Sequence, residues 1–87
     1  MANINGLRNT VALMLSDDYR ERFVAEYRQL MIRIESLSKM LDNWDSGSLE
    51  FTPQCPRSIL EDQLLCMGKY ARILKLRAEL EEINLEI

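Results

Sequence analysis

Apolar residues in the first half of the chain recur at spacings that alternate between four and three positions. Such a pattern has a period of about 3.5 residues, which is typical of a helix that lies along another helix. It predicts a long helix at about residues 17–44, with Ser16 or Asp18 as its N-terminal cap and Gly47 in the turn that ends it. The apolar seam of this helix consists of Phe23, Tyr27, Leu30, Ile34, Leu37, Leu41 and Trp44.

The second half of the chain predicts another helix, at about residues 57–86, with apolar residues on two of its faces. Pro56 suits its first turn, and Ser58 and Glu61 have the spacing of a capping box. One face consists of two neighbouring columns: Leu60, Met67, Leu74 and Glu81, and Leu64, Ala71, Ala78 and Leu85. A polar column, Gln63, Tyr70, Arg77 and Asn84, separates this face from a second apolar column, Ile59, Cys66, Ile73, Leu80 and Ile87. Because one partner helix covers only one face well, the second column predicts contact with another copy of the chain.

The two helices predict an all-α fold, a long antiparallel two-helix hairpin that resembles a coiled coil and assembles into a helical homo-oligomer. Residues 15–87 form the hairpin domain, and residues 1–14 form an N-terminal extension that could hold a short helix. The corner of the hairpin, residues 45–56, holds both prolines and Cys55. No general base stands near Cys55 in the sequence, so we interpret this corner as structural.

Length and composition indicate one small globular domain, with 87 residues of which 47% are hydrophobic and 29% are charged. The formal net charge of −3 argues against general binding to DNA or RNA, which needs a basic face. The chain has no histidine, which excludes histidine-based catalytic triads and most zinc sites, and we expect no cofactor. Cys55 and Cys66 lie too far apart on the predicted elements for a disulfide. No apolar run approaches the roughly 20 residues that span a bilayer, so we expect no membrane partner.

The predicted hairpin register places the charged residues relative to one another. If Trp44 lies opposite Ser58, residues whose numbers sum to about 102 face each other across the hairpin. Arg20 then lies level with Glu81, and we expect an ion pair between them at the open end of the hairpin.

The middle of the hairpin is basic, because residues 27–34 and 64–78 contain no aspartate or glutamate. Such a belt could hold a small anion such as a phosphate diester. Lys69, Arg72 and Lys75 project away from the apolar seams, which favours a solvated face for these three side chains.

Arginines and tyrosines near the seams are the candidates for ligand binding. Arg77 stands in the polar column, where an unpaired guanidinium would be costly to bury, so either an acid from a neighbour or a bound anion should meet it. Tyr27 and Tyr70 offer flat faces for base stacking, and they could equally be aromatic residues of the helix seams. The candidate ligand-binding residues are Arg77, Tyr70, Tyr27, Arg33, Arg28 and Arg20.

Three segments carry a resemblance to a known family: "LSDDYRERFVAEYRQLMIRIESLSKML", the corner "FTPQCPRSILEDQL", and "MGKYARILKLRAELE". Over about residues 15–83 the chain resembles small helical proteins encoded by phages and prophages of gut bacteria, the crAssphage-related family. The features shared with that family are residues 18–23, Cys55 with Pro56, and residues 67–78. More loosely, the chain is similar in size and hairpin plan to phage sponges that sequester the cyclic nucleotides of CBASS or Thoeris defence.

The resemblance implies a phage-encoded anti-defence protein in the cytoplasm of the infected bacterial host. Such a protein would bind a cyclic di- or oligonucleotide immune signal in a pocket at a subunit interface and would sequester it without cleaving it. The alternative is a helical phage adaptor or inhibitor that binds a host or viral protein through the exposed apolar seam. We do not expect an enzyme, because carboxylates such as Glu26 and Glu81 occur without a visible set of base, nucleophile and oxyanion donors.

Overall fold

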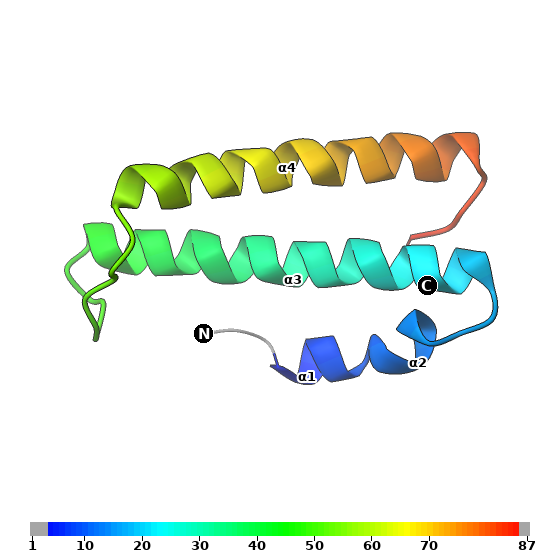
Figure 1. Ribbon diagram of the computed structural model, residues 1–87, viewed down its shortest axis with the longest axis horizontal. Helices are drawn as coiled ribbons and strands as arrows, with labels where there is room; N and C mark the ends of the chain where they lie inside the picture. The colour runs from blue at the N-terminus through cyan, green and yellow to red at the C-terminus, as the bar shows by residue number, and fades with distance from the viewer. Residues whose placement is uncertain (1–3, 86–87) are drawn as a thin grey trace.

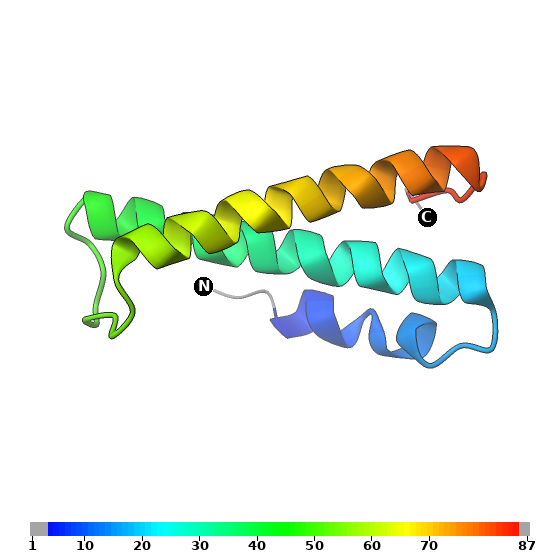
Figure 2. The ribbon, with the colours of Figure 1, turned by 45° about the horizontal axis from the view of Figure 1, so that its top comes forward.

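The computed structural model describes residues 4–85 and is all-α, as the heptad pattern predicted. Its two long helices, α3 (Tyr19–Asp45) and α4 (Arg57–Leu80), pack against each other and run antiparallel (Figure 1). Two short helices, α1 (Ile4–Arg8) and α2 (Val11–Met14), pack on the first part of α3 (Figure 1). Figure 2 shows that α4 and the short helices lie on different sides of α3, which is therefore the central element of the fold.

Local signals set both ends of α3, as predicted. The side chain of Asp18 accepts a hydrogen bond from the Arg20 amide at 2.9 Å, so Asp18 is the N-terminal cap. At the other end Gly47 adopts a φ of 76°, in the left-handed region that favours glycine. The amide of Ser48 then donates to the carbonyl of Asn43 at 2.8 Å, which completes a glycine-capped helix end.

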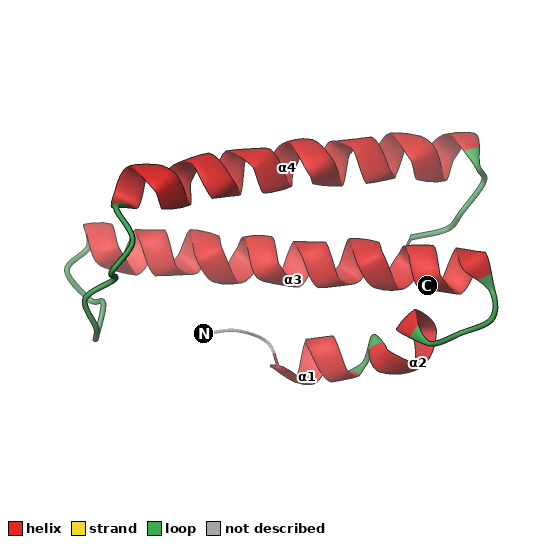
Figure 3. Ribbon diagram, in the orientation of Figure 1, coloured by secondary structure: helices red, strands yellow, loops and turns green. Residues whose placement is uncertain are grey.

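A loop connects α3 to α4 at the corner of the hairpin (Figure 3). Arg57 spans this loop with a two-point contact, in which Nε and Nη2 donate to the Asp45 carboxylate oxygens at 3.0 and 2.7 Å. Arg57 therefore lies opposite Asp45, which agrees with the predicted register. Planar two-point contacts of this kind also limit how far the helix ends can slide past each other.

The start of α4 differs from the predicted capping box. Pro56 precedes the first helical residue, and its carbonyl accepts a hydrogen bond from the amide of Ile59 at 3.1 Å. No side chain caps this helix end, and Glu61 forms an ion pair with Arg57 instead of bonding back to Ser58. The capping-box prediction is therefore wrong, because a guanidinium four positions away offers Glu61 a charged partner.

α4 ends at Leu80, earlier than the predicted end near residue 86. Glu82 adopts a φ of 57°, and the amide of Ile83 donates to the carbonyl of Ala78 at 2.8 Å. This is the hydrogen-bond pattern of a Schellman helix end, with a glutamate in the position that usually holds glycine. Ile83 is buried in the core, so the segment after α4 turns back towards α3 (Figures 1 and 2).

The core lies between α3 and α4 and continues into the segment after α4. Leu74, on the α4 face that was predicted to meet α3, is fully buried. On α3 the seam residues Phe23 and Leu30 are buried, and Tyr27 and Ile34 pack against the same cluster. The buried cluster comprises Phe23, Val24, Leu30, Ala71, Leu74, Ala78 and Ile83. The heptad seam of α3 and the first face of α4 therefore form the hairpin interface, as predicted.

The N-terminal extension is attached to α3 by a buried polar contact. Thr10 is only 1% exposed, and its hydroxyl donates to the carbonyl of Leu7 at 2.6 Å. The same hydroxyl accepts a hydrogen bond from the side-chain amide of Gln29 at 2.8 Å. Leu13 of α2 packs against the core cluster. Apolar packing and a satisfied buried hydroxyl together hold α1 and α2 on the hairpin.

The second apolar column of α4 faces away from α3. We call its members Ile59, Cys66, Ile73 and Leu80 the outer seam. The exposed fractions are 55% for Ile59, 51% for Ile73 and 85% for Leu80, and Cys66 is exposed as well. Ile87, the last member of the column in the sequence, lies outside the described residues. Within a single chain, therefore, the outer seam is uncovered.

Candidate ligand-binding site

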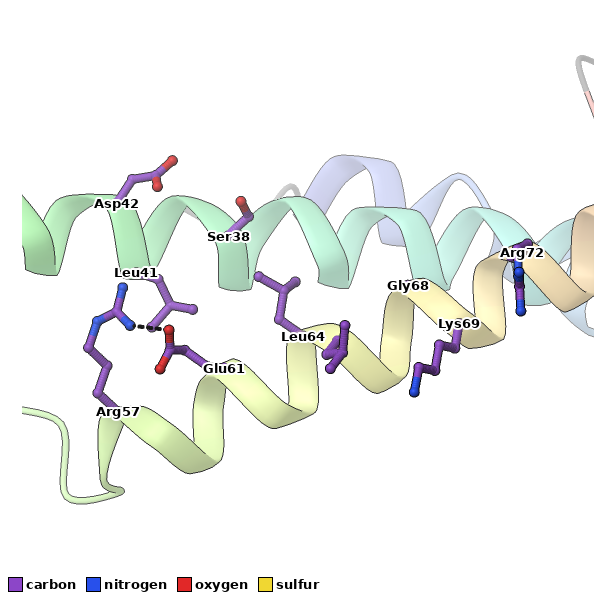
Figure 4. Close-up of a pocket in the computed structure, with 10 residues that line it drawn as sticks. Ser38, Leu41, Asp42, Arg57, Glu61, Leu64, Gly68, Lys69 and Arg72 are labelled. Atoms are coloured by element: carbon purple, nitrogen blue, oxygen red, sulfur yellow. Dashed lines mark ion pairs between the residues drawn. The ribbon is translucent and has the colours of Figure 1, made fainter.

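A groove of about 700 Å³ opens between α3 and α4 near the corner of the hairpin (Figure 4). Leu41 of α3 and Leu64 of α4 point towards each other in this region and provide an apolar floor (Figure 4). Gly68 leaves the α4 side open, since even an added Cβ atom would meet nothing within 4 Å. The groove is lined by Ser38, Leu41, Asp42, Arg57, Glu61, Leu64, Leu65, Gly68, Lys69 and Arg72.

One end of the groove is already neutralised by contacts within the chain. Arg57 forms ion pairs with Asp45 and Glu61, each at 2.7 Å (Figure 4 shows the second of these). The hydrogen bond to Glu61, followed by that to Asp45, raises the pKa of Arg57 above its ordinary value. The guanidinium of Arg57 therefore holds the corner and has little capacity left for a ligand.

The other end of the groove is basic. Lys69 and Arg72 project from the same side of α4 (Figure 4), and both are exposed. Neither forms an ion pair with another of the described residues. The nearest carboxylate among the lining residues that is not paired with Arg57 is Asp42, on the opposite helix. Two cations beside an apolar floor are suited to a ligand that carries phosphate groups and flat rings.

Arg77, which the sequence placed first among the candidates, is engaged at the open end of the hairpin. Its Nε donates to Glu81 at 3.2 Å and its Nη2 donates to the Tyr19 hydroxyl at 2.8 Å. The guanidinium also lies over the Phe23 ring, 4.9 Å from the ring centre. We expected an acid from a neighbour or a bound anion; the acid that contacts Arg77 is Glu81, four positions later in the same chain.

Hydrogen bonds within this cluster change the pKa values of its members. The hydrogen bond to Glu81 raises the pKa of Tyr19 and also raises that of Arg77. The hydrogen bond from Tyr19, with further contributions from Arg77 and Arg20, lowers the pKa of Glu81 below its ordinary value. Each shift favours the charge state in which the cluster is formed, a neutral phenol between a carboxylate and a guanidinium.

The predicted ion pair between Arg20 and Glu81 is replaced by a different arrangement. Nη1 of Arg20 donates to the backbone carbonyl of Glu82 at 2.7 Å, while the carboxylate of Glu81 is taken by Arg77. The register was correct, but Arg77 lies one helical turn before Glu81 on the same helix and is the closer partner.

The remaining candidates lie in different hollows. Arg20 and Arg28 line a hollow of about 520 Å³ beside the segment that follows α4, where Asp18, Glu21 and Glu82 add negative charge. Tyr27 and Arg28 line a hollow of about 320 Å³ against the N-terminal extension.

Arg33 lines a third hollow, of about 290 Å³, together with Gln63 and Met67. Tyr70 is 42% exposed on α4. Arg20 and Arg28 therefore share one hollow, and Arg28 and Tyr27 share another. The six candidates do not line one common pocket within a single chain.

Sequence reasoning assigned Lys69 and Arg72 to a solvated face and so passed over the cations of the groove. The available signal was their place in residues 64–78, a stretch without carboxylates, beside Gly68. In a sequence, a basic run without nearby acids, next to a glycine on a helix, is only weak evidence for a binding site, because most such runs are simply solvated.

Neither a metal-binding cluster nor a membrane-spanning helix occurs among the residues that the structure describes. Within residues 4–85 no group of three or more cysteine, aspartate or glutamate side chains is arranged to hold a metal ion. None of the helices in that part of the chain is long and apolar enough to cross a membrane.

Comparison with known proteins assigns the chain to a family. The family model described as Sequestin matches residues 17–80, which include the two long helices and the corner between them. No curated protein and no solved structure gave a significant match. Family membership indicates binding and sequestration of a signalling molecule rather than catalysis. On the evidence of a match that spans most of its length, this chain belongs to the Sequestin family.

Proposed function

We propose that this protein is a phage-encoded anti-defence protein that binds a cyclic-nucleotide immune signal and sequesters it without cleaving it. Membership of the Sequestin family supports sequestration. The observation that carries the nucleotide proposal is the basic end of the α3–α4 groove, where Lys69 and Arg72 are exposed and have no ion-pair partner among the described residues.

The chemistry of the groove fits a phosphodiester ligand. Each phosphodiester carries one negative charge, and the planar guanidinium of Arg72 can donate to two of its oxygens at once. Lys69 adds a second cation one helical turn away on the same side of α4. The apolar floor at Leu41 and Leu64 offers a surface for a base or a ribose ring.

The groove is broad and open in a single chain, whereas tight sequestration requires that most of the ligand surface be covered. A second copy of the chain would supply that cover, so we place the pocket at a subunit interface. Tyr70, exposed on the same helix, would then be available for stacking on a base.

Native mass spectrometry tests the proposal directly. The purified protein would be measured alone and with a panel of cyclic di- and trinucleotides and cyclic ADP-ribose isomers. We expect a fixed number of one nucleotide to bind and to be released intact after denaturation. Release of a cleaved product would contradict sequestration, and the absence of binding across the panel would contradict a nucleotide ligand.

Charge-removing variants locate the site. We expect Lys69→Gln and Arg72→Gln each to weaken nucleotide retention at least about tenfold, because a charge-assisted hydrogen bond to a phosphate is lost. Lys39→Gln removes an exposed charge from α3 outside the groove and should leave retention unchanged. Loss of retention in Arg33→Gln or Arg28→Gln instead would move the site to the hollows that those residues line.

A second candidate function is a helical phage adaptor or inhibitor of a host or viral protein. It is favoured by the uncovered outer seam and by the pairing of Arg77 with Glu81, which leaves that arginine already satisfied. This function predicts that a protein partner binds with a fixed stoichiometry and that Ile73→Glu abolishes this binding. Nucleotide binding by the isolated protein would argue against it.

A further inference from the structure

Two arginines of the described residues are half-buried, Arg28 on α3 and Arg57 at the start of α4. Arg57 forms ion pairs with Asp45 and Glu61. Arg28, in contrast, forms neither an ion pair nor a hydrogen bond with any residue of the described range 4–85. Folded proteins usually give a partner to a cation that is drawn out of water, so the free guanidinium of Arg28 points to an anion from outside the chain.

The neighbouring residue, Tyr27, also has an unused polar group. Tyr27 is half-buried, and its hydroxyl forms no hydrogen bond with a described residue. In the described part of the chain, every side-chain nitrogen or oxygen that is fully buried has a partner. The polar ends of Tyr27 and Arg28 are therefore still reachable from the surface. A charge in such a partly dehydrated place attracts an anion more strongly than a fully solvated charge does.

Both residues line the hollow of about 320 Å³ between α3 and the N-terminal extension. The extension contributes Gly6, Asn9 and Thr10 to this hollow, and α3 adds an apolar wall at Met31 and Ile32. None of the described residues that line it is acidic. Its volume lies at the lower end of the roughly 300–1,000 Å³ of small-molecule sites, which favours a compact ligand.

We propose that this hollow is a binding site for a small organic anion, separate from the groove between α3 and α4. The ligand class is one carboxylate or phosphate group on a compact apolar or ring-shaped body. The planar guanidinium of Arg28 can donate to two oxygens of that group at once, and the Tyr27 hydroxyl can donate to a third acceptor. The apolar wall at Met31 and Ile32 then covers the body of the ligand.

Charge assigns the anion to the side of Arg28 that faces the extension. Arg28 also lines the hollow of about 520 Å³ beside the segment that follows α4. That hollow is lined by Asp18, Glu21 and Glu82 as well, and only one further arginine offsets them. Three carboxylates repel an anion, whereas the hollow against the extension has no carboxylate among its described lining residues.

The wall that the extension provides is fixed by contacts within the chain. The Thr10 hydroxyl donates to the Leu7 carbonyl at 2.6 Å and accepts from the Gln29 side-chain amide at 2.8 Å. The Sequestin family model matches residues 17–80, so the extension lies outside the matched region. The short helices and α4 lie on different sides of α3 (Figure 2). This site is therefore independent of the groove and of the proposed nucleotide ligand.

Thermal unfolding with three anionic probes tests the site: benzoate, adenosine monophosphate and inorganic phosphate. A ligand that binds the folded chain raises the Tm. We expect benzoate or adenosine monophosphate to raise the Tm, while their uncharged counterparts, benzamide and adenosine, leave it unchanged. A rise with benzoate alone identifies a carboxylate ligand, and a rise with adenosine monophosphate alone identifies a phosphate ligand. A rise with inorganic phosphate alone indicates an adventitious ion only and would overturn the proposal.

Matched arginine variants locate the bound probe. Arg28→Met keeps much of the apolar stem and should remove the rise in Tm, whereas Arg8→Met, an equal change at an exposed arginine of α1, should retain it. Arg28→Lys keeps the charge without the planar fork and should retain part of the rise. Loss of the rise in Arg72→Met instead of Arg28→Met would place the anion in the groove and overturn this site.

Nuclear magnetic resonance of the arginine side chains gives a readout for the single residue. We expect the Nε–Hε signal of Arg28 to shift on addition of the stabilising probe, with Tyr27→Phe and Asn9→Ala each weakening the fitted Kd about two- to tenfold through the loss of one hydrogen bond. Asn9→Ala changes only the extension, so its effect tests whether that wall takes part. An unmoved Arg28 signal, or equal stabilisation of Arg28→Met and the unmodified protein, would refute the site.

Discussion

The hydroxyl of Tyr19 donates a hydrogen bond of 2.6 Å to the carboxylate of Glu81, joining residues 62 positions apart in the chain. Tyr19 is the first residue of α3 and Glu81 caps the end of α4, so the bond closes the open end of the hairpin. Arg77 contacts both groups and lies over Phe23. This cluster at the open end and the contact of Arg57 with Asp45 at the corner hold the two helices in register at both ends of the hairpin.

Low pH should lower the stability of the hairpin, because it protonates the carboxylate of Glu81. The hydrogen bond from Tyr19, aided by Arg77, lowers the pKa of Glu81 in the folded chain, whereas an unfolded glutamate has a pKa of about 4.3. Its stabilising contribution is therefore complete above about pH 4.3 and is lost as the pH falls through the lower folded pKa. Urea unfolding followed by circular dichroism between about pH 3 and pH 7 measures this loss.

The matched variants for this prediction are Glu81→Gln and Glu79→Gln. Glu81→Gln should lack that part of the acid dependence, because it has no carboxylate to protonate. Glu79→Gln changes an exposed glutamate in the same turn and should behave as the unmodified protein does. Equal acid sensitivity in Glu81→Gln and the unmodified protein would contradict the assignment.

Leu74→Ala should lower the free energy of unfolding by about 2–5 kcal/mol, since Leu74 is fully buried between α3 and α4 and truncation leaves a cavity. Phe51→Ala removes a larger side chain that is 57% exposed in the corner and should cost less than about 1 kcal/mol. Chemical denaturation at one fixed protein concentration compares the two. A larger loss in Phe51→Ala would show that the corner carries apolar packing that the single chain does not reveal.

Asp18→Ala should destabilise the protein by about 1 kcal/mol, because the side chain of Asp18 accepts a hydrogen bond from the Arg20 amide at the start of α3. Ser58→Ala should have an effect within about 0.5 kcal/mol, because no side chain caps the start of α4. Both values follow from thermal or urea unfolding. If Ser58→Ala proved as costly as Asp18→Ala, the capping box rejected above would exist in solution.

Glu82→Gly should stabilise the protein by about 0.5–1 kcal/mol, because Glu82 occupies the left-handed region, where a side chain is strained and glycine is not. The backbone carbonyl that accepts from Arg20 is retained in this variant. Gly47→Ala should have the opposite sign and cost about 1 kcal/mol through its φ alone, since nothing lies within 4 Å of the added Cβ. If both variants changed the free energy of unfolding in the same direction, the left-handed backbone at these two positions would not explain the effects.

Much of the fold could be predicted from local patterns. The heptad spacing from Phe23 to Trp44 identified the buried stripe of α3, and a glycine in a turn-rich segment identified its end. The candidate site was less predictable, because six residues chosen by type and face were distributed over separate hollows. Residue type indicates what a side chain can bind, whereas tertiary contacts decide whether it is still available.

By itself, the sequence determined the two long helices, their mutual seam, their register and the uncovered outer seam, because periodicity and caps act over a few neighbouring residues. The end of α4 at Leu80 depended on tertiary structure, since "EEINLEI" has no glycine and the chain turns where Ile83 becomes buried. Two arginines could pair with Glu81: Arg77, four positions earlier in the sequence, and Arg20, which the predicted register places opposite it. The local spacing favours Arg77, and tertiary packing adds the Tyr19 hydroxyl, which contacts both Arg77 and Glu81.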